Sequence, residues 1–123
     1  MNKTPKIQWL PKPEKHDYPA AFSYLSLIYK EEVVRKMINK LKKSKVVSFK
    51  AKDIFRASSL SLLGVSNAHV SRDRKIIING AKLSPILLVR DSLNGKLIIA
   101  DGYHRLCAVY FFDENAEIPC KII

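Results

Sequence analysis

Residues 84–105 read SPILLVRDSLNGKLIIADGYHR, and this stretch carries the clearest fold signal in the chain. It contains two apolar runs, 84–90 and 96–100, which are separated by five residues that end in Asn94-Gly95. An Asn-Gly pair between two β-rich apolar runs is a strong signal for a tight turn. The stretch therefore predicts a β-hairpin, followed directly by a short polar box at residues 101–105.

The residues on either side of this hairpin show helical and strand patterns. Apolar side chains recur every three or four positions from Asp17 to Leu41, which predicts one long amphipathic helix or two consecutive ones, with Asp17 as N-cap. The other predicted elements are a short strand at 46–49, a helix at 68–78 capped by Ser66 or Asn67, a buried helix at 106–112 and a final strand at 117–123. We therefore expect an α+β fold with a small mixed β-sheet. Residues 45–123 would form a single compact unit, and residues 1–44 an N-terminal arm and amphipathic helix packed on it.

Length and composition are those of one globular domain. The chain has 123 residues, of which 47% are hydrophobic and 27% charged, and this composition excludes disordered and fibrous proteins. No run of about 18 apolar residues is present and the first residues lack the apolar stretch of a secretory signal, so we expect a cytoplasmic protein without a membrane partner. Cys107 and Cys120 are too few for a disulfide framework and are predicted to be free thiols.

The net charge of +11 is unevenly distributed along the chain. Residues 1–56 contain 14 basic and 5 acidic side chains, whereas residues 57–123 contain 8 and 6. The densest basic run consists of four lysines after the apolar-periodic stretch: Lys40, Lys42, Lys43 and Lys45. Cations at that position complement the negative end of a helix. The same lysines are the candidate contacts for an alternative function, a nucleic-acid-binding or nuclease-like module.

The box at 101–105 stands at the start of the predicted buried helix. The start of a helix presents unpaired backbone N–H groups and the positive end of its dipole, and both attract an anion. Gly102 has no Cβ and lets a ligand approach the backbone, and Arg105 offers a planar fork that matches two phosphate oxygens. His104 adds a hydrogen bond or a proton relay. These residue types together predict a phosphate-binding site.

Several roles are open for Asp101, because a bare carboxylate beside a phosphate would repel it. It caps the helix, holds a bridging Mg²⁺, or acts as a base toward a hydroxyl substrate. A structural interpretation of the box also stays open, in which His104 pairs with Asp101 and Arg105 pairs with Glu117 or Asp113.

The order of these elements resembles that of the ParB/sulfiredoxin-like superfamily over about residues 45–123. The resemblance rests on the strand that starts Ser-Pro-Ile at 84–86, the Asp-Gly-Tyr-His-Arg box, the helix that contains Ala108, and Ile118-Pro119 at the last strand. In that family the glycine-led turn and the helix after it bind nucleotide phosphates. The resemblance therefore implies phosphate contacts for Gly102, His104 and Arg105. It also implies further phosphate contacts from the helix before the hairpin, with Ser71, Arg72 and Lys75 as candidates.

The resemblance also bears on the reaction. Sulfiredoxins carry a catalytic cysteine directly before the His-Arg pair, and that position is Tyr103 here, so sulfinic-acid reductase activity is not expected. Free-serine kinases of the superfamily have a similar Asp-Gly-His-His-Arg box, which implies phosphoryl transfer or nucleotide hydrolysis with ATP or CTP and Mg²⁺. In such a reaction Asp101 would hold metal or accept a proton, His104 would orient a phosphate oxygen, and Arg105 would stabilise the transferring group.

The expected partner is thus a nucleotide or another small molecule that bears phosphate. Two alternatives from other classes stay open. One is the nucleic-acid-binding module already described, and the other is a non-catalytic interaction protein whose long N-terminal helix covers a partner or a second copy of the chain, as in a homodimer.

Overall fold

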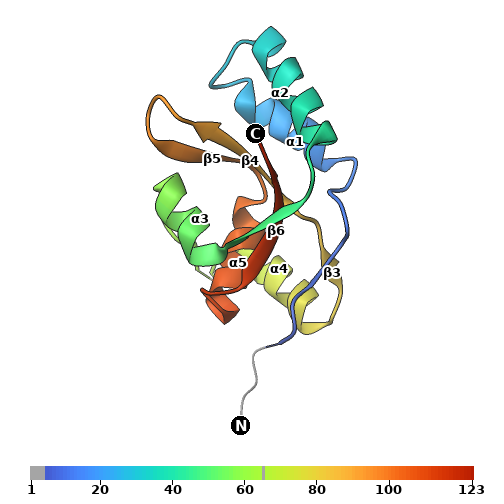
Figure 1. Ribbon diagram of the computed structural model, residues 1–123. Coiled ribbons are helices and arrows are strands. Elements are labelled where there is room, and N and C mark those ends of the chain that lie inside the picture. The colour runs from blue at the N-terminus through green and yellow to red at the C-terminus, as the bar shows by residue number, and fades with distance from the viewer. Residues whose placement is uncertain (1–4, 65) are drawn as a thin grey trace.

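The structure is a computed structural model that describes residues 5–64 and 66–123. The helices in this part of the chain are α1 (Asp17–Leu25), α2 (Glu31–Lys43), α3 (Ala51–Ser58), α4 (Ala68–Ile78) and α5 (Tyr103–Phe112). The strands are β1 (Gln8–Trp9), β2 (Val47–Lys50), β3 (Lys82–Leu83), β4 (Ile86–Asp91), β5 (Lys96–Asp101) and β6 (Glu117–Ile122). Figure 1 shows how the helices surround the central strands, and the expected α+β class is confirmed.

The main sheet has the strand order β2-β6-β4-β5 and is mixed. β4 and β5 form the predicted antiparallel hairpin, while β6 runs parallel to β4 and antiparallel to β2. In the hairpin turn the Asn94 N–H donates to the Asp91 carbonyl at 3.2 Å, and Gly95 has a φ of +63°. An L side chain is strained at that φ, which explains the glycine at the end of the turn. β1 and β3 form a separate, short parallel pair.

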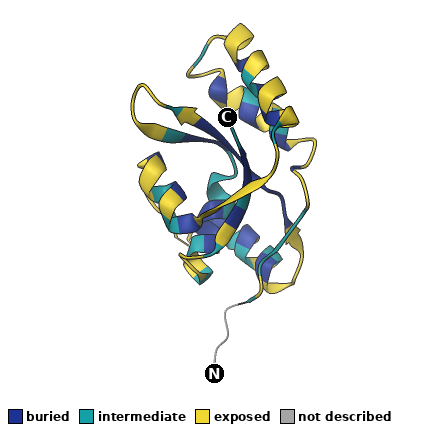
Figure 2. Cartoon of the chain, viewed as in Figure 1, coloured by how far each residue is buried: buried dark blue, intermediate teal, exposed yellow. Residues whose placement is uncertain are grey.

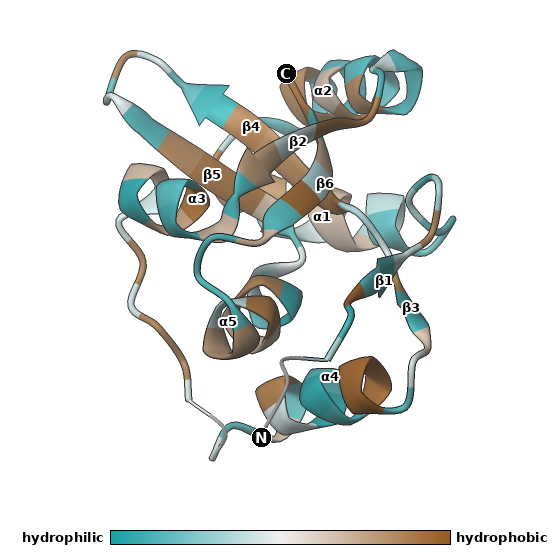
Figure 3. Cartoon of the chain, turned by 60° about the horizontal axis from the view of Figure 1, so that its bottom comes forward, coloured by the Kyte–Doolittle hydropathy of each residue, from teal (hydrophilic) through white to brown (hydrophobic). Residues whose placement is uncertain are grey.

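Alternation of side chains across the sheet gives the hairpin two cores, one on each face. Leu87, Val89, Ile98 and Ala100 pack against α1 and α2. Ile86, Leu88 and Ile99 face the opposite way and pack with buried residues of α3, α4, α5 and β6. In Figure 3 the strands are largely hydrophobic, and in Figure 2 the burial is deepest where they meet the helices. The sheet therefore separates the α1–α2 side of the molecule from the α3–α5 side.

The amphipathic segment from Asp17 forms two helices, separated by residues 26–30. Val34, Ile38 and Leu41 of α2 are buried against the sheet, and its other face is exposed (Figure 2). The buried Lys121 of β6 donates from Nζ to the carbonyl of Lys42 at 2.9 Å. This hydrogen bond satisfies a carbonyl at the C-terminus of α2 and ties that helix to the sheet.

The prediction that Asp17 caps α1 is wrong. α1 begins at Asp17, its N-cap is His16, and no side chain of the described residues caps it. The Asp17 carboxylate is buried and accepts hydrogen bonds from the Glu14 N–H at 2.9 Å and from the Ser84 hydroxyl. The long-range partner Ser84, which no local pattern reveals, decides how this carboxylate is used. The cap predicted for α4 is confirmed at Asn67, which accepts from two N–H groups of the first turn.

Both cysteines are free thiols, as predicted, and both are buried. Burial raises the pKa of Cys120 to about 12 and also raises the pKa of Cys107. A thiol with a raised pKa is a poor nucleophile, so neither sulfur is a candidate for covalent chemistry. Within the described residues, no helix combines the length and the apolarity needed to cross a membrane.

Candidate functional site

The start of α5 is shaped by Gly102, which has a φ of +108°. A Cβ at this position would lie 2.8 Å from Cγ1 of Ile86 and 2.9 Å from Nη2 of Arg105. Glycine is therefore required for two reasons: its φ strains an L residue, and there is no room for a Cβ. No side chain of the described residues caps the helix here, so the first-turn N–H groups have neither an intrahelical partner nor a capping side chain.

Arg105 lies over Gly102 and is held by two carboxylates. Its Nη2 is 2.9 Å from Oδ2 of Asp101, and its Nη1 is 3.4 Å from Oδ1 of Asp17. The exposed fractions of the side chains are 15% for Arg105, 18% for Asp101 and only 2% for Asp17. With the Ser84 hydroxyl on Asp17, these groups form a buried polar network that joins α1, β3–β4, β5 and α5.

Burial affects the two carboxylates of this network differently. It raises the pKa of Asp101 to about 6; Arg105 counteracts the effect and Asp17 reinforces it. Burial also tends to raise the pKa of Asp17, but the Ser84 hydroxyl and Arg105 outweigh it and hold that pKa below its ordinary value. Asp17 is consequently the carboxylate that stays ionised, and Asp101 is the one that takes up a proton in mildly acidic solution.

A pH dependence of stability follows from the raised pKa of Asp101. Between pH 3.8 and about 6 the folded chain retains a proton on Asp101 that the unfolded chain has lost, so the free energy of unfolding falls as the pH rises through this window. Asp101→Asn is expected to lack this fall. Chemical denaturation of both proteins across the window measures it, with the exposed Asp113→Asn as a control that keeps the wild-type slope. If the free energies of unfolding of wild type and Asp101→Asn differ by the same amount at every pH in the window, the raised pKa of Asp101 is contradicted.

Several expectations for the box are corrected by this geometry. The N-cap of α5 is Gly102 rather than Asp101, whose carboxylate pairs with Arg105 instead of with backbone N–H groups. Arg105 does form an ion pair, but its partners are Asp101 and Asp17 and not Glu117 or Asp113. The physical reason is that the Arg105 side chain reaches back one helical turn, to the end of β5 and to the buried start of α1.

The same contacts test whether Asp101 fits Mg²⁺. Its carboxylate faces the Arg105 guanidinium, and a divalent cation at that position would sit beside a fixed positive charge. Within residues 5–64 and 66–123, no group of three or more His, Cys, Asp or Glu side chains is arranged to hold a metal ion. The residues present therefore do not fit a metal held by Asp101.

His104 lies at a junction between two helices. Its ring is 4.7 Å from that of His69 in the first turn of α4, measured between centroids. Further along, the guanidinium of Arg74 lies 4.3 Å from the ring centre of Phe111. Contacts at these two levels show that α4 and α5 run side by side in the same direction. Their N-terminal ends therefore meet, with two positive dipole ends and two imidazoles in one place.

Asp73 lies one helical turn after His69 on α4 and is 5% exposed. Burial raises its pKa, while Arg72, Arg105, His104 and His69 act in the opposite sense. Burial lowers the pKa of His104 and His69 lowers it further, whereas Asp73 raises it. His104 is consequently neutral at neutral pH and gains a proton readily only when an additional negative charge approaches.

The three candidates on α4 differ in their distance around the helix from His69. At 100° per residue, Arg72 lies about 60° from His69, whereas Ser71 and Lys75 lie about 160° and about 120° from it. Arg72 is 66% exposed at the side chain, with Nε 3.9 Å from Oδ1 of Asp73. The structure brings Arg72 to the junction and leaves Ser71 and Lys75 away from it.

The lysines of the alternative function lie on the other side of the sheet. Lys40, Lys42 and Lys43 occupy the last turns of α2, Lys45 follows it, and all four are exposed. They complement the negative end of α2, as the charge pattern indicates. Because α2 packs on the face opposite to α4 and α5, these lysines and the helix junction cannot form one site.

Sequence reasoning missed His69, Asp73 and the buried role of Asp17. The spacing of His69 and Asp73, four residues apart after the Asn67 cap, was a usable signal that both lie on one face of a helix. No local signal could have paired His69 with His104, because that contact depends on how α4 and α5 pack. Tyr103, at the position of the sulfiredoxin cysteine, donates from its hydroxyl to the Ser61 carbonyl.

Comparisons of the chain with protein-family models, with curated proteins and with solved structures gave no match.

Proposed function

We propose that the junction of α4 and α5 binds the phosphate groups of a small molecule, with a nucleotide such as ATP or CTP as the expected ligand. The observation that carries the proposal is the meeting of two helix N-termini at the His69–His104 ring pair, 4.7 Å apart. Two positive dipole ends and the unbonded N–H groups of α5 favour negative oxygens at this place. Arg72, exposed at its rim, adds a positive charge.

The imidazoles make phosphate binding depend on pH, which groups of fixed charge do not. His104 is neutral at neutral pH because burial and His69 lower its pKa. A phosphate at the junction stabilises the imidazolium, so binding takes up a proton and strengthens as the pH falls. In this role His104 orients a phosphate oxygen, as the family resemblance also implies.

The sequence implied that Arg105 contacts the phosphate. In this proposal Arg105 does not contact it. Its guanidinium is committed to Asp101 and Asp17, and its buried Nε has no hydrogen-bond partner among the described residues. It therefore fixes the start of α5, while the N–H groups and the imidazoles meet the ligand. Phosphoryl transfer by this site would require Asp101 to leave Arg105, and we propose binding as the primary activity.

The binding test is a titration of ATP, CTP and inorganic phosphate followed by thermal unfolding and by calorimetry at pH 6 and pH 8. Binding is expected to be tighter at pH 6. A hydrogen bond to a charged group contributes about 1.5–3 kcal/mol, so His104→Gln is expected to weaken binding by about tenfold or more. His69→Gln is expected to act in the same direction.

Lys75→Gln is the matched control, since it removes a positive charge from α4 on the side away from His104 and is expected to change the affinity by less than about twofold. A double substitution of Lys40 and Lys43 by glutamine tests the nucleic-acid alternative, with binding of single-stranded DNA as the measurement. No stabilisation by any of the three ligands, or equal losses in Lys75→Gln and His104→Gln, would overturn the proposal. Binding of single-stranded DNA that depends on Lys40 and Lys43 would favour the alternative.

A further inference from the structure

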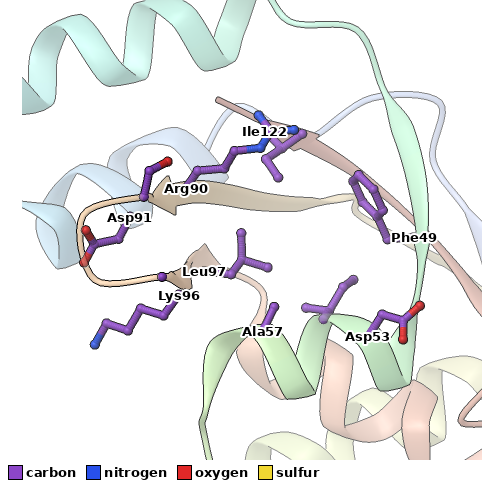
Figure 4. A pocket seen from close by; sticks show the side chains of 11 residues that line it. Phe49, Asp53, Ala57, Arg90, Asp91, Lys96, Leu97 and Ile122 are labelled. Atoms are coloured by element: carbon purple, nitrogen blue, oxygen red, sulfur yellow. The ribbon is translucent and has the colours of Figure 1, made fainter.

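The sheet face toward α3, α4 and α5 is covered at only one end. Near the hairpin turn, beyond the buried Leu88 and Ile99, it opens into a cavity of about 430 Å³. This volume lies within the usual range for small-molecule sites. The cavity is walled by the hairpin end, by β2 and β6, and by α3 (Figure 4).

The body of the cavity is apolar. Phe49 of β2, Ile54 and Ala57 of α3, Leu97 of β5 and Ile122 of β6 surround it (Figure 4). These side chains come to one place because of the sheet register, in which Ile122 pairs with Leu88 and Leu97 pairs with Arg90. Phe49 is 39% exposed and Leu97 is partly exposed. Contact of this apolar surface with water is unfavourable, so its burial by a ligand would lower the free energy.

Arg90 is an exposed basic residue of the cavity wall. It shares a sheet face with Leu88, and its side chain runs toward Ile122 (Figure 4). Its backbone N–H donates to the Ile123 carbonyl at 2.9 Å, which holds the ends of β4 and β6 together. None of the ion pairs among the described residues includes Arg90.

The other charged residues of the rim have structural partners or point elsewhere. The Asp91 carboxylate accepts a hydrogen bond from Nδ2 of Asn94 at 2.8 Å within the hairpin turn. Asp53 lies in the first turn of α3, where a carboxylate complements the helix dipole. Lys96 extends away from Leu97 and the cavity (Figure 4). Arg90 is therefore the charged side chain of the rim that lies beside the apolar wall, next to Ile122 (Figure 4).

We propose that this cavity binds a small organic acid, with an apolar, aromatic or branched body and a single anionic group. The body would lie on Phe49, Ile54, Leu97 and Ile122, and the anionic group would pair with Arg90. The site is independent of the α4–α5 junction, because the two share no residue. It has no motif in the sequence, since its residues come from separate segments around 49, 54, 90, 97 and 122.

The test compares two fluorescent probes that differ mainly in charge: 8-anilinonaphthalene-1-sulfonate and the neutral N-phenyl-1-naphthylamine. The proposal predicts saturable one-to-one binding of the sulfonate to the native protein. Arg90→Gln is expected to weaken the sulfonate about tenfold and to change the affinity for the neutral probe by less than about twofold. Lys96→Gln, which removes a neighbouring positive charge that points away, is the matched control and is expected to leave both affinities nearly unchanged.

Ala57→Phe fills the cavity and is expected to abolish binding of both probes. If its melting temperature shows that it does not fold, Phe49→Ala replaces it, because the half-exposed Phe49 can be shortened with little loss of stability and should still weaken both probes. The absence of saturable binding would overturn the proposal. Equal losses in Arg90→Gln and Lys96→Gln, or unchanged binding in Ala57→Phe and Phe49→Ala, would overturn it as well.

Discussion

Replacement of Asp17 by alanine is expected to lower the free energy of unfolding by about 3–5 kcal/mol, the range found when one partner of a buried ion pair is removed. Asp17 is 2% exposed and accepts hydrogen bonds from the Ser84 hydroxyl and the Glu14 N–H while it pairs with Arg105. Its removal leaves Arg105 with Asp101 alone and leaves the buried Ser84 hydroxyl without its acceptor. Urea denaturation of wild type and variant measures the loss.

Two controls separate this network from the general effect of a lost negative charge. Asp113→Ala removes an exposed carboxylate near the end of α5 and is expected to change the free energy of unfolding by less than about 0.5 kcal/mol. The double variant Asp17→Ala with Arg105→Met is expected to lose less than the sum of the single losses, because each single variant already breaks the same Asp17–Arg105 ion pair. A loss for Asp17→Ala no larger than that of the Asp113 control would show that the network does not stabilise the fold.

Gly102→Ala is expected to lower the free energy of unfolding by about 2–4 kcal/mol, because an L residue is strained at its φ and the added methyl group overpacks its neighbours. That φ is +108°, and the new Cβ would lie 2.8 Å from Ile86 in the core beneath α5. Ile86 is fully buried and cannot move away cheaply. The start of α5 and Arg105 above it must shift, so phosphate binding at the junction should weaken together with stability.

Two other glycines serve as matched controls. Gly95 has a φ of +63°, and no atom lies within 4 Å of the place that an added methyl group would take, so Gly95→Ala reports strain without a clash. Gly64 has neither feature, and Gly64→Ala is expected to be nearly neutral. Thermal unfolding should therefore rank the losses in the order Gly102, Gly95, Gly64. A Gly102→Ala protein as stable as Gly95→Ala would show that the contact with Ile86 relaxes at no cost.

The hairpin and the helices around it were predictable because each depends on a pattern of a few consecutive residues. Gly102 was expected to let a ligand approach the backbone, but Ile86 and Arg105 occupy the space where its Cβ would lie. The apolar runs of β4 and β5, the Asn94-Gly95 turn and the apolar spacing of α2 all act through local geometry. The cap at Asn67 followed from the same kind of signal, and the structure contains it. The cap at Asp17 did not, since a carboxylate buried by tertiary packing takes the partner that packing provides.

By itself, the sequence determined the α+β class, the hairpin and the polar box at the start of α5. Only the tertiary structure decided what the box contacts: Arg105 pairs with a residue 88 positions earlier, and His104 meets His69. The same holds for the cavity at Arg90, which exists because β2, β4, β5 and β6 line up beside α3. The physical reason is that backbone preferences act over a few residues, whereas the partners of buried charges depend on strand order and helix packing.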